Sequence, residues 1–348
     1  MQQKLRVGIV GFGFMGKSHL AIWKKMPNLL PVAICDKHVE RVKKDAEKHH
    51  IKTYSDVSLM LERENLTIVD ICTPPQTHYL IAIEAIKAGC HVIIEKPLTV
   101  NTNEAKELID YAKRTGVKLC VIHNDKFQPG IIDALSYVNA GKIGEVVGAC
   151  ENYLCTRDNP MLVDRNHWCH SLPGGRIGEC LPHPVYTLQS ILGNDLNVVK
   201  ALGMKLGPYE WVPFDDLYVV LSNNEGKIGK IYVSFNSPKN ETQVKIYGKK
   251  CMLDIDLYTR TVVRRSSRAP ESKVEKMKEN IRNAYQITSS TFNLALRSII
   301  GRLRNGHEVC MRLFVESIIY DKPLPVSFEE AYNNVRIVEQ IIEKLKIC

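Results

Sequence analysis

Short apolar runs alternate with longer amphipathic stretches over the first 124 residues of the chain. The runs predict β-strands at 6–10, 32–35, 68–72, 91–94 and 118–122. The stretches between them predict helices at 15–26, 39–49, 56–62, 78–88 and 103–114, three of which end close to Pro27, Gly89 or Gly116. This alternation predicts an α/β domain with a doubly wound parallel sheet and helices on its faces.

The pattern changes after Pro129, where glycines and a loop-rich stretch up to Gly175 precede alternating apolar runs. The runs at 217–221, 230–235 and 244–247 suit antiparallel strands with one covered face. Helices are expected at 184–192, 290–304 and 328–347, with a turn at 321–325 before the last. We therefore expect a first domain at 1–124 and an α+β domain at 125–348, whose last helix packs back on the first domain.

Composition fits a folded chain of two domains, because 348 residues exceed what one core usually holds. Hydrophobic residues make up 45% and charged residues 24%, which argues against long disorder. No run reaches the length of about 18 apolar residues that a membrane span needs. We expect no membrane partner.

The formal net charge is +9, and much of the basic excess falls between residues 239 and 282. Neither aromatic interleaving nor a known DNA-reading motif accompanies this stretch, so a solvated loop and helix face is the favoured interpretation over nucleic-acid binding. The 11 cysteines are odd in number, and several lie in apolar runs. Reduced thiols in a cytoplasmic protein explain them better than a disulfide framework. The apolar N-terminus is interrupted by glycines and does not resemble a signal peptide.

A glycine-rich loop follows the first strand and opens the first helix, in the order Gly11-Phe12-Gly13-Phe14-Met15-Gly16. Gly11 permits a tight turn, Gly13 lets the backbone approach a pyrophosphate, and Gly16 allows close packing of helix and sheet. The helix N-terminus offers N–H donors and a positive dipole end to the anion. A bare glycine turn is the alternative.

Asp36 ends the next strand at the distance expected of a ribose-binding carboxylate. It would accept a hydrogen bond from the 2′-hydroxyl of NAD and repel the 2′-phosphate of NADP. Lys37, His38 and Arg41 lie close enough to soften this preference, so NADP stays open as the second cofactor. A helix-capping role for Asp36 is the other alternative.

Two further motifs give the chain a family resemblance. Ile71-Cys72-Thr73-Pro74-Pro75-Gln76-Thr77-His78 follows one strand, and Val92-Ile93-Ile94-Glu95-Lys96-Pro97-Leu98 follows the next. With the glycine loop, the 124–129 stretch, the 141–145 stretch and Gly174-Gly175 before His183, the chain resembles the family of glucose-fructose oxidoreductase, inositol dehydrogenase and related sugar dehydrogenases, known as Gfo/Idh/MocA.

This resemblance implies a Rossmann domain, then a domain with an open, mainly antiparallel sheet that commonly builds homodimers or homotetramers, with the substrate held between the domains. It implies NAD(H) or NADP(H) as cofactor and a cis Lys96-Pro97 bond. Besides the glycine loop and Asp36, the cofactor residues expected from the motifs are Lys37, Thr73, Pro74, His78, Glu95, Lys96 and Asn124. The carboxyl ends of the strands in a doubly wound sheet independently place several of them together.

Lys96 is the first catalytic candidate, because a lysine next to nicotinamide can stabilise an alkoxide-like oxygen and transfer its proton. Pairing of Lys96 with Glu95 or with a ribose hydroxyl is the alternative role. His183 is the second candidate, since the histidine of the family's Asp-x-x-x-His pattern lies in the substrate pocket and acts as acid or base. A packed loop histidine is the alternative.

The chain departs from the family at this pattern, because Glu179 stands at the Asp position and prolines bracket His183. Pro184 is expected to open a helix, with His183 just before it. Pro182 makes an i,i+4 pairing of Glu179 with His183 doubtful. By the same resemblance, Tyr153, Arg157 and Trp168 join Glu179, Lys96 and His183 as the expected substrate residues, although core packing would equally explain the aromatic ones.

The cysteines and histidines between 150 and 183 lack the spacing of a metal site, and we expect no metal. The expected function is an NAD(P)-dependent oxidoreductase that acts on a secondary hydroxyl or ketone of a sugar, cyclitol or similar polyol. The alternatives are an NAD-dependent glycosidase of the same fold and a non-catalytic cofactor-sensing regulator. The intact Glu95-Lys96-Pro97 argues against the regulator.

Overall fold

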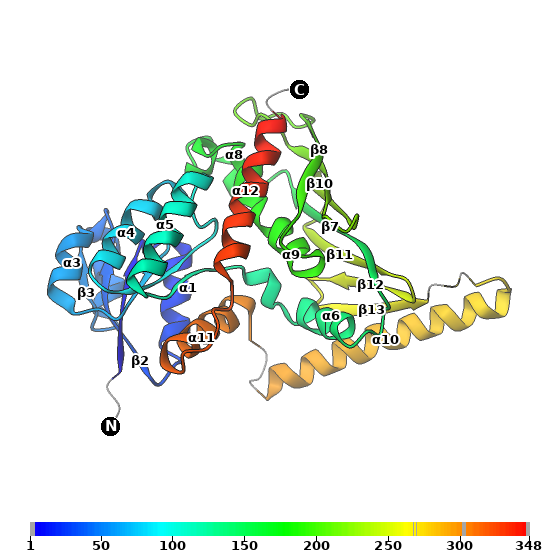
Figure 1. The fold of residues 1–348 in the computed structure, drawn as a ribbon, viewed down its shortest axis with the longest axis horizontal. Helices are drawn as coiled ribbons and strands as arrows, with labels where there is room; N and C mark the ends of the chain where they lie inside the picture. The colour runs from blue at the N-terminus through cyan, green and yellow to red at the C-terminus, as the bar shows by residue number, and fades with distance from the viewer. Residues whose placement is uncertain (1–3, 267, 269, 301–303, 346–348) are drawn as a thin grey trace. The chain divides into compact units, whose positions relative to one another are not determined.

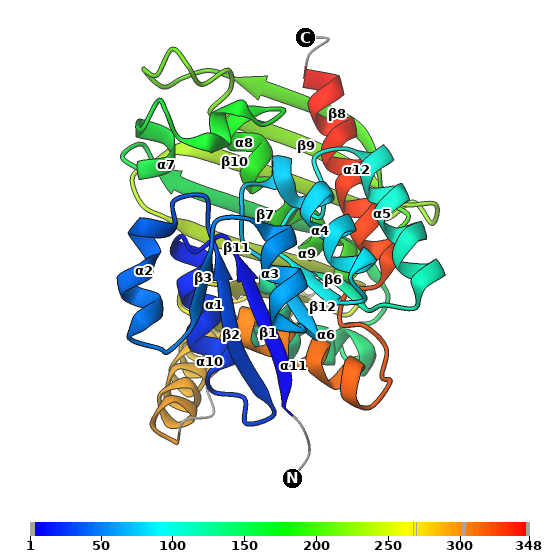
Figure 2. The ribbon, with the colours of Figure 1, turned by 90° about the vertical axis from the view of Figure 1, so that its left-hand side faces the viewer.

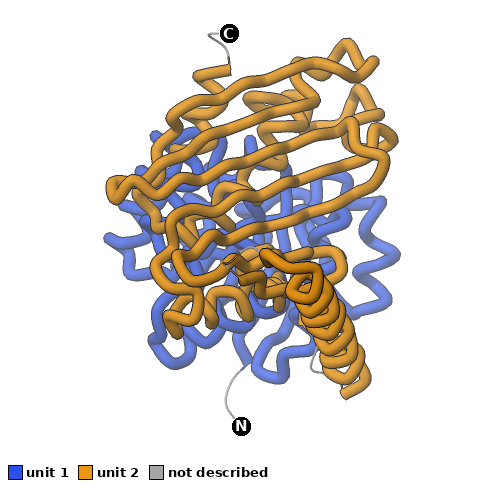
Figure 3. Tube along the Cα trace, turned by 90° about the vertical axis from the view of Figure 1, so that its right-hand side faces the viewer, with its two compact units in different colours: residues 1–123, 307–335 blue, residues 124–306, 336–348 orange. Residues whose placement is uncertain are grey.

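The computed structural model describes residues 4–266, 268, 270–300 and 304–345, and the chain divides into two compact units (Figure 3). Unit 1 comprises Met1–His123 and His307–Val335, and unit 2 comprises Asn124–Gly306 and Arg336–Cys348. The second unit is thus inserted into the first, and the helix α12 contributes to both.

Unit 1 contains a six-stranded, fully parallel sheet in the order β3-β2-β1-β4-β5-β6 (Figure 2). Its strands are β1 (Leu5–Val10), β2 (Leu29–Cys35), β3 (Lys52–Tyr54), β4 (Ile68–Ile71), β5 (His91–Ile94) and β6 (Leu119–Val121). Its helices are α1 (Phe14–Trp23), α2 (Val39–Glu47), α3 (Val57–Glu64), η1 (Pro75–Thr77), α4 (His78–Lys87), α5 (Thr102–Thr115), α11 (Gly306–Ile319) and the start of α12 (Phe328–Leu345). The strand order is that of a dinucleotide-binding doubly wound sheet.

Local chemistry explains these elements. The residues of β4 are all buried, as expected for a central parallel strand covered on both faces. Asp56 accepts a hydrogen bond from the Leu59 N–H and caps α3, and Asn101 does the same for α5 through the Glu104 N–H. Gly116 ends α5 in the left-handed conformation that glycine adopts most easily.

Unit 2 is built on a seven-stranded sheet in the order β13-β12-β11-β7-β10-β9-β8 (Figure 1). Its strands are β7 (Val146–Thr156), β8 (Asn197–Met204), β9 (Asp216–Ser222), β10 (Ile228–Ser237), β11 (Glu241–Gly248), β12 (Cys251–Asp256) and β13 (Thr261–Ser266). Its helices are η2 (Asn124–Phe127), α6 (Pro129–Asn139), α7 (Pro160–Val163), η3 (Trp168–Ser171), α8 (Gly175–Cys180), α9 (Pro182–Leu192), α10 (Lys273–Ile299) and the end of α12.

The sheet of unit 2 is mixed, because β7 and β10 pair in parallel while the other neighbours are antiparallel. Side chains of alternate residues, such as Val219, Ile231 and Ile246, enter one hydrophobic core with α9 and the end of α12. The opposite face carries Tyr218, Ile228 and Tyr247, which are exposed. One face of this sheet is therefore covered, and the other is open.

The expected α/β and α+β fold class is confirmed, but several elements differ from the expectation. The helix expected at 290–304 is wrong: α10 begins at Lys273 and ends at Ile299, and residues 301–303 lie outside the described part. The sequence carried a signal for the true start, since Ser272 and Glu275 form a capping box. Helix α11 was not expected, because its residues are apolar around most of the circumference and show little periodicity.

The helix around His183 also begins earlier than expected. Helix α9 starts at Pro182, so His183 lies in its first turn and not before it. A proline at the first helical position loses no hydrogen bond, which is why Pro182 is tolerated there. Among the described residues, no helix combines the length and the hydropathy needed to cross a membrane.

Candidate functional site

The glycine loop lies where the carboxyl ends of three strands of unit 1 meet. The Gly11 N–H donates to the Cys35 carbonyl, and the Cys72 N–H donates to the Val10 carbonyl. Gly11 has a φ of +85°, and a Cβ there would lie 2.8 Å from the Thr73 side chain. A Cβ at Gly16 would overlap the Gly11 carbonyl oxygen. Both positions therefore require glycine.

Gly13 has the open backbone that a bound pyrophosphate needs. A Cβ built on it would meet no heavy atom of the described residues within 4 Å. Gly13 is also the N-cap of α1, so the first N–H groups of that helix start here. Phe12 is buried and Phe14 is exposed, so the loop turns alternate side chains inward and outward. The loop fits a dinucleotide phosphate.

Asp36 follows β2 and is fixed by two backbone donors. Its Oδ2 accepts the Phe12 N–H at 2.8 Å, and its Oδ1 accepts the His38 N–H at 2.8 Å. Each carboxylate oxygen retains a further lone pair that a ribose hydroxyl can use. The bond to Phe12 ties the Asp36 carboxylate directly to the glycine loop.

His78 links the two motif loops that follow β4 and β5. Its imidazole is buried, with Nδ1 2.8 Å from the Pro97 carbonyl oxygen and Nε2 2.9 Å from the Thr73 carbonyl oxygen. Burial lowers the pKa of His78, although the two carbonyl contacts oppose this. The Lys96-Pro97 bond is cis, as the family resemblance implied. His78 therefore acts from beneath the loops, as a positioning group.

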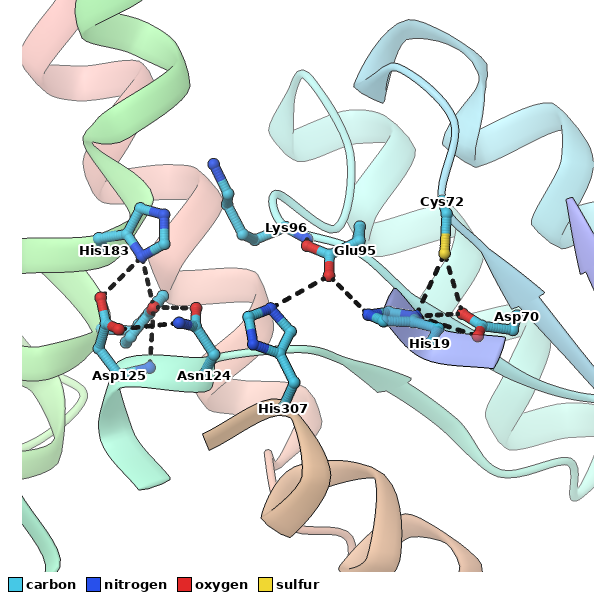
Figure 4. A network of polar contacts seen from close by, with 10 residues as sticks. His19, Asp70, Cys72, Glu95, Lys96, Asn124, Asp125, His183 and His307 are labelled. Carbon is cyan, nitrogen blue, oxygen red and sulfur yellow. Dashed lines mark hydrogen bonds and ion pairs between the residues drawn. The ribbon is translucent and has the colours of Figure 1, made fainter. Parts of the chain in front are cut away.

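A chain of buried charges lies under Lys96 (Figure 4). The Glu95 Oε2 accepts the Lys96 N–H at 3.1 Å, while Oε1 lies 3.1 Å from Nε2 of His19 and 3.5 Å from Nε2 of His307. The other ring nitrogen of His19, Nδ1, is 3.0 Å from Asp70. Asp70 also accepts the Trp23 indole N–H at 2.6 Å. The chain joins α1, β4, β5 and α11.

Opposite charges stabilise this cluster against the cost of burial. Desolvation lowers the pKa of His19, but Asp70 and Cys72 outweigh it and hold that pKa well above its ordinary value. Desolvation raises the pKa of Glu95, but His19 and His307 outweigh it and hold that pKa well below its ordinary value. Both directions favour the charged forms of His19 and Glu95 over the neutral ones.

His183 belongs to a second polar cluster, within unit 2 (Figure 4). Its Nδ1 lies 2.8 Å from Oδ2 of Asp125 and 2.7 Å from the Tyr186 hydroxyl. That hydroxyl donates to Oδ1 of Asn124 at 2.9 Å and accepts the Asp125 N–H at 3.2 Å. With both neighbours able to accept, the proton belongs on Nδ1, which leaves the lone pair on Nε2.

The other expected substrate residues have separate partners. Glu179 forms a buried ion pair with Arg176, whose guanidinium lies over the Phe235 ring. The Tyr153 ring stacks on His183 with the ring centroids 5.9 Å apart. The remaining two are Arg157, which donates to Asn236, and Trp168, which packs against His167.

Sequence reasoning missed several residues of these clusters, including Asp70. Asp125 is the carboxylate beside His183. Tyr186 lies on α9, three residues after His183. His19 and His307 are the partners of Glu95. Asp125 lies inside the 124–129 motif, and this was the available signal. Asn124, expected with the cofactor residues, lies in unit 2, where it bonds to Asp125 and Tyr186.

Groups of metal-ligand type in the described residues converge around His19, not in the cysteine- and histidine-rich stretch 150–183. They are His19 with Glu95 and His307, and His19 with Asp70 and Cys72. The ion pairs described above account for both groupings, and we assign no metal there.

Comparison with known proteins gives the chain a family. The model of the oxidoreductase family GFO_IDH_MocA, NAD-binding Rossmann fold, matches residues 5–123. The model of its C-terminal alpha/beta domain matches residues 136–346.

Three known proteins show the extent of the similarity. The inositol 2-dehydrogenase of Salmonella paratyphi B is 22% identical over 83% of this chain and 84% of its own. The levoglucosan dehydrogenase of Pseudarthrobacter phenanthrenivorans is 33% identical, over only 44% of this chain and 41% of its own. The structure of the WlbA dehydrogenase from Bordetella pertussis, in complex with NADH and UDP-GlcNAcA, superposes with a TM-score of 0.81 at 20% identity. That match covers 100% of this chain and 97% of that one.

The buried cluster yields a stability prediction. His19→Gln leaves Glu95 and Asp70 buried with one cation fewer, and should lower the free energy of unfolding by about 3–5 kcal/mol. The exposed pair of Lys48 and Asp45 is the control, because Lys48→Gln should cost less than about 1 kcal/mol. Denaturant unfolding measures both.

The pH dependence of that difference has a definite sign. Because the pKa of Glu95 is lowered on folding, its contribution is present above the unfolded value of about 4.3 and is lost as the pH falls further. The difference between wild type and His19→Gln should therefore shrink below about pH 4. A difference that is the same at pH 3 and pH 6 would contradict the charged cluster.

Asp36 yields a cofactor prediction. The chain should bind NAD(H) more tightly than NADP(H), and Asp36→Asn should reduce that preference by about tenfold or more, which is about 1.4 kcal/mol. Asp45→Asn, in the same unit, should leave the preference unchanged. Fluorescence titration with each cofactor is the measurement. Tighter binding of NADP(H) by the wild type would show that Asp36 does not read the ribose.

Proposed function

Because the chain belongs to the GFO_IDH_MocA family of NAD-binding oxidoreductases, we propose that it transfers hydride between nicotinamide and a carbon that bears a secondary hydroxyl or ketone. We infer a sugar, cyclitol or similar polyol as its substrate. The observation that carries the proposal is the Glu95-Lys96-Pro97 turn, in which Glu95 accepts the Lys96 N–H, in the unit that holds the glycine loop. A lysine held by a buried carboxylate neighbour has a defined position, and acid–base chemistry at nicotinamide needs one.

The bound dinucleotide supplies the hydride acceptor or donor. The residues of the chain do the rest. The N–H groups at the start of α1 hold the pyrophosphate, and Asp36 holds the adenosine ribose. On oxidation, the hydroxyl proton of the substrate would pass to the neutral Nε2 of His183, and hydride would leave its carbon for the nicotinamide that the bound dinucleotide supplies. We assign Lys96 Nζ to the substrate oxygen, where its ammonium form stabilises the developing alkoxide.

We assign His183 the second acid–base role. Its Nδ1 contacts with Asp125 and Tyr186 support the tautomer whose Nε2 can accept a proton. A carboxylate at Nδ1 also stabilises the imidazolium that forms, in the way that the Asp of a Ser-His-Asp triad does. Asp125 is therefore proposed as the positioning residue of His183, in place of Glu179.

A sugar-like substrate is supported by the printed names of the relatives, which include levoglucosan dehydrogenase and inositol 2-dehydrogenase. Tyr153 offers an aromatic face close to His183. We propose Tyr153, Trp168, Arg157 and Glu179 as further substrate contacts. Stacking on a ring suits the two aromatic residues, and charge suits hydroxyl recognition by the other two.

The test of this function is a panel of polyols, free sugars and nucleotide sugars, scored by NADH absorbance with NAD⁺ supplied. Reduction of NAD⁺ with one class of the panel supports the proposal. Release of an aglycone from a glycoside with no net change in NADH would identify the glycosidase instead. Cofactor binding with no turnover in either direction across the panel would favour the regulator.

We further propose that the chain works in the cytoplasm as a homodimer or homotetramer that assembles through the open face of the unit 2 sheet. The cysteines in the described residues are free thiols, and most are buried. Tyr218, Ile228 and Tyr247 give that face an apolar surface that a second copy could cover.

Replacing the proposed catalytic lysine separates chemistry from binding. Lys96→Met should lower kcat by about 10²–10⁴-fold while NAD affinity stays within about threefold, because the ammonium acts on the substrate oxygen. Lys106→Met, at an exposed position of α5, is the matched control and should change neither value. A Lys96→Met enzyme that loses NAD affinity and turns over normally at saturation would make Lys96 a binding residue.

A double-mutant cycle tests which carboxylate serves His183. His183→Asn should reduce kcat/KM by about 10²–10⁴-fold. Asp125→Asn should also be severe, and the double variant should be little worse than His183→Asn alone, because the two act as a unit. Glu179→Gln should instead lower the melting temperature, since Arg176 would stay buried and charged without its partner.

A second cycle, which combines Glu179→Gln with His183→Asn, is compared with the first. The effect of Glu179→Gln on kcat/KM should multiply with that of His183→Asn. Strong coupling of Glu179 with His183, together with additivity between Asp125 and His183, would reverse the assignment.

A further inference from the structure

Helix α10 turns a mainly polar face toward its own domain and an apolar face toward solvent, the reverse of an ordinary surface helix. None of its 27 residues is buried. Its half-buried residues, which include Glu279, Asn283 and Gln286, are mainly polar. The Gln286 amide brackets the edge strand β13: its Oε1 accepts the Arg264 N–H at 2.9 Å, and its Nε2 donates to the Arg264 carbonyl at 3.2 Å. A surface helix normally turns its apolar face to its own domain.

The apolar face of α10 points away from β13 and carries a continuous stripe. Its members are Val274, Met277, Ile281, Tyr285, Thr288, Phe292, Leu296 and Ile299. All are exposed, and the seven apolar ones keep between 47% and 82% of their surface. Successive members are three or four residues apart, so they share one side of the helix. Seven large apolar side chains in one exposed row indicate a covering partner.

The stripe runs straight along the whole helix. Its spacing repeats in steps of three, four and four, so that Val274, Tyr285 and Leu296 follow one another at eleven-residue intervals. An 11-residue repeat gives about 3.67 residues per turn, close to the 3.6 of an undistorted helix. The stripe therefore stays on one face for the full length of α10, roughly 40 Å at about 1.5 Å per residue. Figure 3 shows this helix beside the lower edge of the unit 2 sheet.

The stripe is also symmetric about its own midpoint, which lies between Gln286 and Ile287. Reversing the helix about that point exchanges Val274 with Ile299, Met277 with Leu296, Ile281 with Phe292, and Tyr285 with Thr288. A second copy of the helix that runs in the opposite direction would thus place a stripe residue against every stripe residue. Self-complementarity of this kind is what a two-fold, isologous interface requires.

The charges beside the stripe favour the same arrangement. Lys273 and Lys278 flank its N-terminal part, and their counterparts across the two-fold axis are Ile300 and Ala295. An antiparallel partner therefore brings these lysines to the carboxyl-terminal turns of the other helix, where its dipole is negative. A parallel partner would bring lysine against lysine. A lipid surface would impose no symmetry on the stripe.

We propose that α10 is a homodimerisation helix, which pairs in antiparallel fashion with α10 of a second copy around a two-fold axis at its midpoint. This surface is separate from the open face of the sheet. Two different isologous contacts on one chain would close into a tetramer of D2 symmetry when their axes intersect at right angles.

The first experiment measures self-association of the full chain by sedimentation equilibrium. Ile281→Glu and Phe292→Glu should each raise the dissociation constant of the step that α10 mediates by at least about tenfold, roughly 1.4 kcal/mol, because each places a charge against an apolar residue of the other helix. That step is dimer to monomer, or tetramer to dimer if the sheet face also pairs. Asn293→Glu, exposed on the other side of α10, is the matched control and should have no effect. Helix content by circular dichroism and NAD affinity check that the variants fold.

The second experiment tests direction and register by oxidative cross-linking. Val274→Cys combined with Ile299→Cys in one chain should give disulfide-linked dimers well above the wild-type background. Either single variant alone should not, because its own counterpart lies at the far end of the pair. Equimolar mixing of the two single variants should restore the link.

Three results would overturn the proposal. One is unchanged self-association in Ile281→Glu and Phe292→Glu. Another is cross-linking of Val274→Cys with itself, which means a parallel pair. The third is a chain that stays monomeric and sediments with phosphatidylserine vesicles, with that binding lost in Phe292→Glu, which would make α10 a lipid-binding helix.

Discussion

The carboxylate of Glu95 is buried in unit 1, where its negative charge needs cationic and hydrogen-bonding partners. The position of the Glu95-Lys96-Pro97 turn depends on those partners. Removing an ionised group from water costs several kcal/mol unless cations and hydrogen bonds surround it. Here His19 comes from the glycine-loop helix and His307 from a segment that returns to the unit much later in the chain. The same carboxylate accepts the Lys96 N–H. One electrostatic requirement thereby holds α1, the helix that the glycine loop opens, in register with the proposed catalytic lysine.

The imidazole of His183 is also oriented by a carboxylate, but from a different place in the chain than the family pattern implies. In the family pattern, an acidic residue four positions earlier would share its helix face, and here that residue is engaged with Arg176. Asp125 and the Tyr186 hydroxyl meet Nδ1 instead, the first from η2 and the second from the same helix as His183. Leu181 keeps right-handed helical dihedrals between α8 and α9, so the ion pair with Arg176 is what takes Glu179 away from His183. Orientation of the ring is therefore a tertiary property and not a helical one.

The part of this architecture that the sequence predicted rests on local rules. Gly11, Gly13 and Gly16 follow a strand and open a helix, and each has a steric reason visible in that context alone. Buried parallel strands appear as short, mainly apolar runs, which is why β4 and β5 were expected almost to the residue. The cofactor, the family and the cis Lys96-Pro97 bond followed from motifs and are confirmed. The catalytic roles stay predictions.

What the sequence did not predict involves partners that are distant along the chain. His19 and His307 meet Glu95 only after folding, and no spacing rule connects them. The strand β3 is three residues long and carries no apolar run. Helix α10 was expected too short and too late, although its capping box at Ser272 and the regular spacing of its apolar residues are local signals.

The insertion of unit 2 into unit 1 has a consequence for biosynthesis. His123 and Glu330 are 207 residues apart in the chain, yet they contact each other within unit 1 at 3.0 Å. At roughly 5–20 residues per second, a ribosome needs on the order of 10–40 s to make the intervening chain. During that interval the nascent cofactor-binding half lacks α11, and with it the His307 partner of Glu95. The amino-terminal half is therefore completed only after residues 124–306 of unit 2 have been made. A chain terminated before residue 307 leaves the charge of Glu95 without its His307 partner.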